Sequence, residues 1–300
     1  MKCAVALAVM VAASVTAAAV QEPGRFKSRA DMVLIDALVT NDRRVVTGLT
    51  ASDFELRDNG VPQSIEQLYV EQLPLTIIMV LDTSGSVAGE RLDALKKGAT
   101  VVVDRLRQGD QAAIVSFSAE LHLAAQATGD RATLRETIAR LRADGGTALQ
   151  DATFAGLVLR GAARTRTLII VFSDGVDTGS ILSEDRVSEV ARRSDATVYA
   201  IGIREPARTG PGGRMLLQPD RATDDRFLTR IAEETGGRLL HAEQNREITA
   251  TFGRIIDEFN SRYILGYVPA GVSEKGWHPV TVRLKKRQGT VLARRGYIAD

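Results

Sequence analysis

The chain has 300 residues, of which 44% are hydrophobic and 25% are charged, the balance of an ordinary globular protein. Its formal net charge is only +2. Because no basic stripe is interleaved with aromatic residues, the composition argues against a dedicated nucleic-acid-binding protein. The length allows one large domain or two small ones.

The amino terminus has the organisation of a secretory signal peptide. A positively charged start precedes an apolar stretch from Cys3 to Val15, and small residues continue to Ala19. We predict cleavage after Ala19, so that residues 1–19 form the signal peptide and residues 20–29 a polar linker. The apolar stretch is short for a membrane span, so no integral span is expected after cleavage; an uncleaved anchor is the alternative. Cleavage removes the single cysteine, and a chain without disulfides is compatible with export.

Residues 30–72 have the pattern of a small β unit. A strand is predicted over residues 32–40, and residues 53–57 alternate apolar and polar side chains as a half-buried strand does. Asp-Asn-Gly at residues 58–60 is a strong hairpin signal. Residues 64–70 are expected to return as the partner strand of this hairpin.

The central region, residues 74–259, alternates strands with amphipathic helices. A helical spacing of apolar residues is clear from residue 92 to 107. Further helices are predicted over residues 148–160, 187–193, 227–235 and 247–260. Such alternation predicts an α/β fold, a mostly parallel sheet with helices on both faces. Ligands in these folds bind at the carboxyl ends of the strands.

The carboxy-terminal segment, residues 260–300, returns to β character, with strands predicted over residues 263–268, 280–284 and 291–297. The first β unit alone is small for a stable core. We therefore predict that the two flanking segments join into a small β-sandwich and that the central domain is inserted between them. Two independent β appendages are the alternative. Trp277 is expected in the core or at the rim of the sandwich.

The most informative feature of the chain is Asp82-Thr83-Ser84-Gly85-Ser86, which directly follows the apolar residues 75–81. This pattern indicates a buried strand with a polar tip. Because Mg²⁺ binds oxygen ligands, three oxygens at alternate positions suggest a metal site at the carboxyl edge of a sheet. The same residues also suit an ordinary strand-to-helix turn with an N-cap, and this segment alone leaves both interpretations open.

Two later segments favour the metal site. Gly145-Gly146-Thr147 presents a hydroxyl just before a predicted helix. Residues 168–172 form a second apolar run, which is followed by Ser173-Asp174-Gly175. Two strands that end in Asp, with a Thr loop between them, are hard to explain as three separate capping events.

Together these residues resemble the metal-ion-dependent adhesion site (MIDAS) of von Willebrand factor A (vWA) domains. All five motif positions have the expected residue type and order: Asp82, Ser84, Ser86, Thr147 and Asp174. The resemblance covers about residues 74–259, and the whole chain resembles exported bacterial proteins of this type. It implies a Rossmann-like vWA domain.

The resemblance also implies a function. The five residues would hold a divalent cation, Mg²⁺ foremost and Mn²⁺ or Ca²⁺ otherwise, and the cation would coordinate an acidic side chain of a partner protein. This describes a non-enzymatic binding module in the periplasm, at the cell surface or in the medium. Asp151 and Asp177 are candidates to hydrogen-bond to the ligands or to metal-bound water without binding the metal themselves. Their alternatives are an early-helix carboxylate for Asp151 and a surface-loop role for Asp177.

Two other functions are weighed against this one. A metal-dependent hydrolase would act at Asp82, but the Asp-x-Asp motif of phosphatases is missing and no histidine sits at a strand end beside Ser84 or Ser86. No P-loop is present, so no nucleotide is expected. In the other alternative the metal of the vWA domain is structural and the β-sandwich carries the binding function.

Overall fold

The computed structural model describes residues 32–42, 44–69, 73–159, 165–173, 176–203, 221–273 and 275–299. The predicted signal peptide and linker lie outside these residues, as does Asp174. Within the described residues, no helix combines the length and the apolar character needed to cross a membrane.

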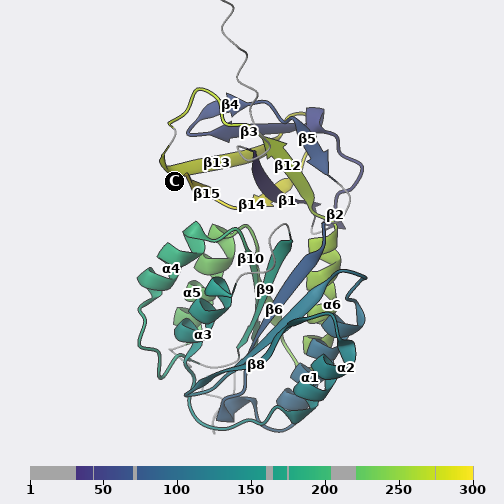
Figure 1. Cartoon of the computed structure of the whole chain (residues 1–300), viewed down its shortest axis with the longest axis vertical. Helices are drawn as coiled ribbons and strands as arrows, with labels where there is room; N and C mark the ends of the chain where they lie inside the picture. The colour runs from purple at the N-terminus through teal and green to yellow at the C-terminus, as the bar shows by residue number, and fades with distance from the viewer. Residues whose placement is uncertain are drawn as a thin grey trace, which may run out of the picture. The chain divides into compact units, whose positions relative to one another are not determined.

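The central sheet has six strands in the order β11-β10-β9-β6-β7-β8 (Figure 1). Its strands are β6 (Leu75–Asp82), β7 (Gln111–Phe117), β8 (Leu121–Thr128), β9 (Arg166–Ser173), β10 (Thr197–Ile203) and β11 (Leu239–Ala242). All neighbours are parallel except β7 and β8. The predicted mostly parallel sheet is therefore confirmed, with an antiparallel strand at one edge. All eight residues of β6 are buried, as expected for a central parallel strand.

Helices cover both faces of this sheet (Figure 1). One face packs against α1 (Glu90–Asp104), α2 (Arg131–Arg140) and α6 (Asn245–Asn260), and the other against α3 (Leu149–Val158), α4 (Glu184–Arg193) and α5 (Arg221–Glu234). Side chains of β6 alternate between the two: Met79 faces the first layer, and Ile78 and Val80 face the second. Two hydrophobic cores thus hold β6 in place.

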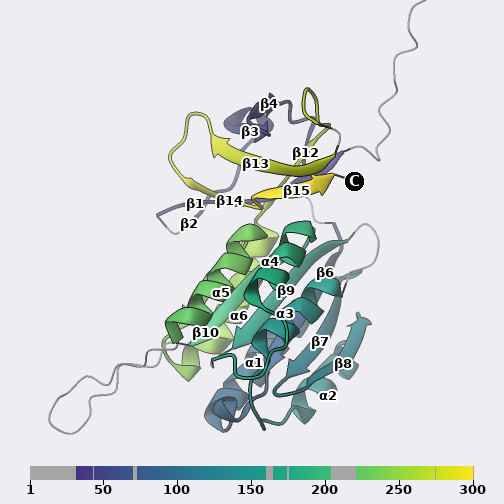
Figure 2. The ribbon, with the colours of Figure 1, turned by 90° about the vertical axis from the view of Figure 1, so that its left-hand side faces the viewer.

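The flanking segments combine into two further sheets. One has the order β14-β1-β12-β5 with β2 paired to β1, and the other has the order β15-β13-β3-β4. These strands are β1 (Val33–Asn41), β2 (Arg44–Val45), β3 (Phe54–Asp58), β4 (Val61–Gln63), β5 (Gln67–Tyr69), β12 (Tyr263–Tyr267), β13 (Gly276–Leu284), β14 (Thr290–Ala293) and β15 (Gly296–Ala299). Both sheets contain strands from both ends of the chain, which Figure 2 shows in purple and yellow.

One hydrophobic cluster, which includes Ile35, Phe54 and Leu265, joins the two flanking sheets. The predicted joining of the flanks into a β-sandwich is confirmed. Trp277 lies on β13 and is 39% exposed, which places it at the rim.

The prediction that residues 64–70 form the partner strand of the first hairpin was wrong. Asn59 and Gly60 have φ values of 48° and 79°, the positive values that a tight two-residue turn requires. This turn pairs Asp58 directly with Val61, so β4 is the partner strand. The chain then crosses to the other sheet, where β5 pairs with β12.

The sandwich buries a polar cluster around Asp58, whose exposed fraction is 0%. Tyr267 and Tyr297 each donate a hydroxyl hydrogen bond of 2.9 Å to Asp58 Oδ2. Oδ1 lies 2.8 Å from Nδ1 of the buried His278. Burial raises the pKa of Tyr267 and raises that of Tyr297 to about 12, so both phenols keep their protons to donate. The cluster therefore gives both oxygens of a fully buried carboxylate a partner.

We predict that Asp58→Ala lowers the free energy of unfolding by about 3 kcal/mol, because it leaves buried donors without an acceptor. Tyr297→Phe removes a single hydroxyl and should cost about 1 kcal/mol. Urea unfolding followed by circular dichroism measures both. An unchanged midpoint for Asp58→Ala would contradict the structural role of the cluster.

Arg262 joins the sandwich to the central domain. Its exposed fraction is only 2%. Its guanidinium donates to the carbonyl of Gly236 at 2.7 Å in the central domain. On the sandwich side it donates to the carbonyls of Asp36 and Leu292, each at 3.1 Å. The planar fork of an arginine can serve several acceptors at once. One side chain therefore holds backbone from both parts of the chain.

A second link lies at the first residue of β9. Arg166 forms a two-point ion pair with Asp36 of β1, at 2.7 and 3.2 Å, and its guanidinium lies 4.2 Å from the ring centre of Phe259. The amino end of β9 therefore meets the sandwich. Because β6 and β9 are parallel, their carboxyl ends lie at the opposite edge of the sheet.

We predict that Arg262→Met uncouples the two parts, because the backbone carbonyls that it serves lose their donor in a buried place. Differential scanning calorimetry should change from one transition to two, or show a lower single transition, with a loss of about 3 kcal/mol. Arg287→Met, at a half-exposed arginine on the sandwich, is the matched control. A calorimetric trace identical to wild type would contradict the coupling.

Candidate functional site

The carboxylate of Asp82 lies at the carboxyl end of β6 with an exposed fraction of 0%. The backbone N–H of Ser84 donates to Oδ1 at 2.8 Å. The hydroxyl of Ser173, the last residue of β9, donates to Oδ2 at 2.7 Å. Two adjacent strand ends therefore fix both oxygens of this carboxylate.

The two serines of the motif lie directly after Asp82. Ser84 is 1% exposed and occupies the N-cap position of a short 3₁₀ helix, η3 (Gly85–Val87), but its side chain makes no capping hydrogen bond. Its hydroxyl lies 3.0 Å from that of Ser86, which is exposed. The N-cap of α1 is Gly89, which has no side chain to cap with. The Ser84 hydroxyl is therefore directed to its neighbour in the motif and caps neither helix.

The loop that carries Thr147 is bonded to this motif. Asp144 N donates to the carbonyl of Thr83 at 2.9 Å, and Gly85 N donates to the carbonyl of Gly145 at 3.0 Å. Gly145 has φ +75°, a conformation in which a side chain would be strained. These two hydrogen bonds bring the loop before α3 against the loop after β6.

Thr147 is held by its backbone. It is 4% exposed, and its N–H donates to the hydroxyl of Thr178 at 3.0 Å. Its carbonyl accepts from the N–H of Thr178 at 2.8 Å. No hydrogen bond of the Thr147 hydroxyl is found among the described residues, so this oxygen is available to a ligand.

The structure thus describes four of the five predicted ligands. It groups Asp82, Ser84 and Ser86 and bonds the loop of Thr147 to theirs. The fifth, Asp174, lies outside the described residues, although it directly follows Ser173 in the chain. The ligand set as a whole stays a prediction.

Asp151 and Asp177 brace the loop that follows β9. Asp151 accepts from the N–H groups of Ile181 at 2.9 Å and Leu182 at 2.8 Å. Asp177 accepts from Gln150 N and from Ser180 N, each at 3.0 Å. The braced loop also carries Thr178. Any support that these two carboxylates give to the ligands would therefore act through the loop.

Burial raises the pKa of Asp82, while hydrogen bonds from Ser84 and Ser173 and the charge of Arg91 act in the opposite direction. Arg91 donates to the carbonyl of Ser86 at 3.2 Å. Among the described residues, the groups that donate to the two carboxylate oxygens are the backbone N–H of Ser84 and the hydroxyls of Ser84 and Ser173, all of them neutral. A buried carboxylate is costly without a countercharge, so this edge of the sheet suits a cation.

A family model described as the von Willebrand factor type A domain matches residues 77–176, which include Asp82, Ser84, Ser86 and Thr147. The chain contains a von Willebrand factor type A domain. An uncharacterized protein of Synechocystis sp. is 31% identical over 235 residues, which are 73% of this chain and 51% of that protein. Inter-alpha-trypsin inhibitor heavy chain H4 of Sus scrofa is 26% identical over 133 residues, 41% of this chain and 14% of that protein. The chain therefore spans at most about half the length of these two relatives.

Solved structures share the fold. A von Willebrand factor type A protein from Catenulispora acidiphila superposes with a TM-score of 0.53 at 16% identity, over 83% of this chain and 74% of that one. The vWF domain of the type V pili tip protein Mfa5 from Porphyromonas gingivalis gives a TM-score of 0.50 at 16% identity, over 63% of this chain and 96% of that one. Identities this low establish the vWA fold alone.

The donors at the edge of this vWA domain fit a hard divalent cation. Carboxylate and hydroxyl oxygens are what Mg²⁺ accepts, with water completing its shell. Among the described residues, no three His, Cys, Asp or Glu side chains gather into a metal cluster. A cation at Asp82 would therefore rely on serine and threonine hydroxyls and on Asp174.

Sequence reasoning missed two residues of the site. Ser173 directly precedes Asp174, and its place at a strand tip was a usable signal. Thr178 is 31 residues from Thr147, and nothing in the local sequence marks it as the partner of that backbone.

We predict that Thr178→Val weakens Mg²⁺ binding about tenfold, because groups that orient metal ligands contribute on that scale. The melting temperature should change little. Isothermal titration calorimetry measures the affinity. Thr100→Val removes a hydroxyl that bonds only within α1 and is the control. Equal affinities for the two variants would show that Thr178 does not position Thr147.

Proposed function

We propose that this chain is an exported, non-enzymatic binding protein whose vWA domain holds a divalent cation, Mg²⁺ foremost, and uses it to bind an acidic side chain of a partner protein. The observation that carries the proposal is the buried Asp82 carboxylate, whose hydrogen-bond donors among the described residues are neutral, beside the paired hydroxyls of Ser84 and Ser86. The ligands would be Asp82, Ser84, Ser86, Thr147 and Asp174.

Hydroxyl ligands suit this function because they are neutral. Because the three hydroxyls add no negative charge, the two carboxylates only match the charge of a divalent cation, which can still accept a further carboxylate oxygen at an open coordination position. The cation would serve as a bridge between two proteins. Arg91, which lies beside the carbonyl of Ser86, adds a fixed positive charge near the same place.

The position of the site also supports a partner protein. The amino end of β9 is occupied by the sandwich through Arg166 and Asp36. The carboxyl edge lies at the other end of the same strands, where open α/β sheets bind their ligands. Two fold relatives, the pili tip protein Mfa5 and the PilB minor pilin of Streptococcus sanguinis, carry names of surface structures. They motivate a search for the partner outside the cytoplasm.

The histidines support a non-enzymatic role. Each of the three contacts another group: His278 lies in the sandwich cluster, His241 lies 3.0 Å from Asp225, and His122 lies on β8 beside Glu120. A serine nucleophile needs a base within hydrogen-bond reach.

The test is calorimetric titration of Mg²⁺, then Mn²⁺ and Ca²⁺, into the metal-stripped chain. We expect saturable binding by wild type and its loss in Asp82→Ala, because the buried carboxylate is the central charge of the ligand set. Asp104→Ala, at an exposed aspartate near the end of α1, is the matched control and should bind as wild type does.

Circular dichroism should show that Asp82→Ala remains folded. Undiminished binding by a folded Asp82→Ala would contradict the assignment of the ligands. An absence of saturable binding by wild type with all three cations would contradict the metal-dependent function.

A further inference from the structure

Three side chains of the β-sandwich form a line of contacts from a buried carboxylate to an exposed hydroxyl. Asp58 Oδ1 lies 2.8 Å from Nδ1 of His278, and Nε2 of the same ring lies 3.4 Å from the hydroxyl of Ser273. Asp58 and His278 have exposed fractions of 0% and 1%, whereas Ser273 is exposed in the loop between β12 and β13. The order is that of the Asp-His-Ser arrangement in which a serine acts as a nucleophile.

The imidazole of His278 is held on its Nδ1 side. Besides the carboxylate of Asp58, the hydroxyl of Tyr297 and the amide of Asn59 lie 3.2 and 3.3 Å from Nδ1. The ring of Tyr297 also packs on the imidazole, with the two ring centres 4.8 Å apart. Because an ionised carboxylate only accepts hydrogen bonds, the close partner Nδ1 carries the proton of the neutral ring. Nε2 is then an acceptor, and it is the nitrogen next to Ser273.

The hydroxyl of Ser273 has two acceptors within reach. It lies 3.3 Å from the carbonyl oxygen of Lys275 and 3.4 Å from Nε2 of His278. Both contacts are longer than the roughly 2.6–3.2 Å that joins a nucleophile to its base during reaction, and such contacts are often looser before a substrate binds. The exposed side chain therefore holds its proton within reach of the base without a firm bond to the backbone.

The loop also offers hydrogen-bond donors beside this hydroxyl. In the part of the chain that the structure describes, the backbone N–H groups of Gly271, Val272 and Ser273 donate to no acceptor. When a serine attacks a carbonyl carbon, its own N–H and that of a nearby residue can stabilise the negative oxygen that forms. Donors of this kind are therefore available next to Ser273.

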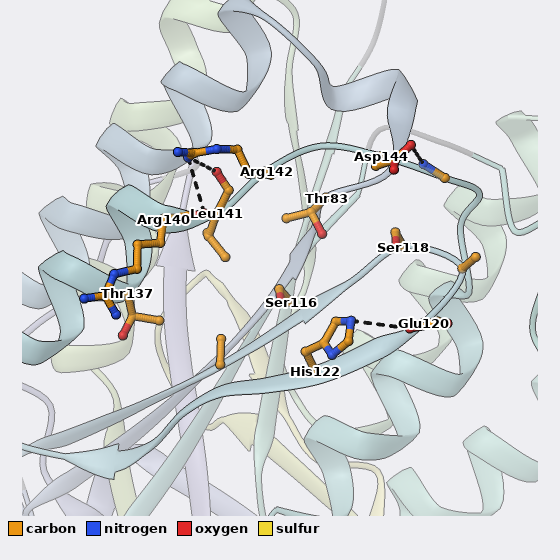
Figure 3. Close-up of a pocket in the computed structure, with 13 residues that line it drawn as sticks. Thr83, Ser116, Ser118, Glu120, His122, Thr137, Arg140, Leu141, Arg142 and Asp144 are labelled. Atoms are coloured by element: carbon orange, nitrogen blue, oxygen red, sulfur yellow. Dashed lines mark hydrogen bonds and ion pairs between the residues drawn. The ribbon is translucent and has the colours of Figure 1, made fainter.

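The other two histidines have a different environment. His241 lies 3.0 Å from Asp225, and His122 lies 3.7 Å from Glu120 in a pocket of the vWA domain (Figure 3). Within the described ranges, neither ring makes a hydrogen bond to a serine or threonine hydroxyl. The combination of a carboxylate on one ring nitrogen and a serine on the other therefore belongs to His278.

We propose that Ser273 is an acylation site, whose hydroxyl takes the acyl group of an ester with His278 as the base. The Ser273 oxygen attacks the carbonyl carbon of the ester while Nε2 accepts the hydroxyl proton. The bond from that carbon to the alkoxy oxygen then breaks, and the leaving alcohol takes the proton from Nε2. The products are acylated Ser273 and a free alcohol. This inference goes beyond the proposed function, because it concerns the sandwich and needs no metal.

The test treats the full chain with p-nitrophenyl acetate in the presence of a chelator and follows acetylation of each serine by peptide mass spectrometry. Ser52 is the internal control, because it is also exposed and its hydroxyl lies 2.8 Å from the hydroxyl of Thr50 instead of a base. We expect Ser273 to be acetylated about 100-fold faster than Ser52, the scale of general-base catalysis. In urea that unfolds the chain the two rates should become similar, because only the fold holds the imidazole beside Ser273.

Variants identify the groups that carry the reactivity. Ser273→Ala should abolish the fast acetylation. His278→Gln keeps a hydrogen-bonding side chain but removes the base, so that Ser273 should react about as slowly as Ser52. His122→Gln removes an exposed histidine from the vWA domain and is the matched control, which should react as wild type does. Circular dichroism shows whether each variant is folded.

Equal rates for Ser273 and Ser52 in the folded wild type would overturn the inference. Fast acetylation of Ser273 that persists in a folded His278→Gln variant would do the same. If His278→Gln does not fold, the comparison of Ser273 with Ser52 in wild type, with and without urea, decides alone. Since every measurement is made in chelator, none of these results depends on the metal-binding function.

Discussion

The organisation of this protein depends on one buried carboxylate. β6 lies in the middle of a parallel sheet with helices on both faces, so every residue of the strand is buried, including its last, Asp82. The apolar residues before Asp82 are what remove water from it, and burial raises its pKa in consequence. The protein offsets part of this cost with the N–H of Ser84 and the hydroxyl of Ser173. Both donors are neutral, which leaves the edge suited to a cation.

The sandwich sets which edge of the sheet is free for a ligand. Arg166 and Arg262 fasten the vWA domain to the flanking sheets, and both take backbone or side-chain acceptors from β1 or its neighbours. These contacts occupy the amino end of β9. Since β6 is parallel to β9, the carboxylate of Asp82 lies at the opposite end. The attachment to the sandwich and the candidate metal site therefore lie at opposite edges of one sheet, so that a partner bound at the free edge would not need to displace the sandwich.

Much of the fold could be predicted from the sequence, because it depends on patterns that are local. Apolar runs with polar tips predicted β6 and β9, and the helical spacing of apolar residues predicted α1 and α6. The helix α2 was missed because only Leu134 and Ile138 of its ten residues are buried, too few for a clear period. β8 was missed because it is an edge strand with one buried residue. The hairpin partner was misplaced because the path of a chain between two sheets depends on packing far away in the sequence.

The site shows the same division between local and distant causes. Asp82, Ser84 and Ser86 belong to one short segment, so their grouping could be predicted. The contacts that fix Thr147 come from Thr178 and from the pairing of Asp144 with Thr83, which only the folded chain brings together.

Two buried aspartates show how a structural carboxylate differs from a candidate ligand. Asp58 and Asp82 have the same exposed fraction, 0%. Asp58 lies inside the sandwich, where Tyr267, Tyr297 and His278 surround both of its oxygens. Asp82 lies at the tip of a strand beside the Ser84 and Ser86 hydroxyls and a pocket that opens next to Thr83. Burial alone therefore does not mark a functional carboxylate. What distinguishes Asp82 is burial together with further oxygens at an edge of the sheet that a ligand can reach.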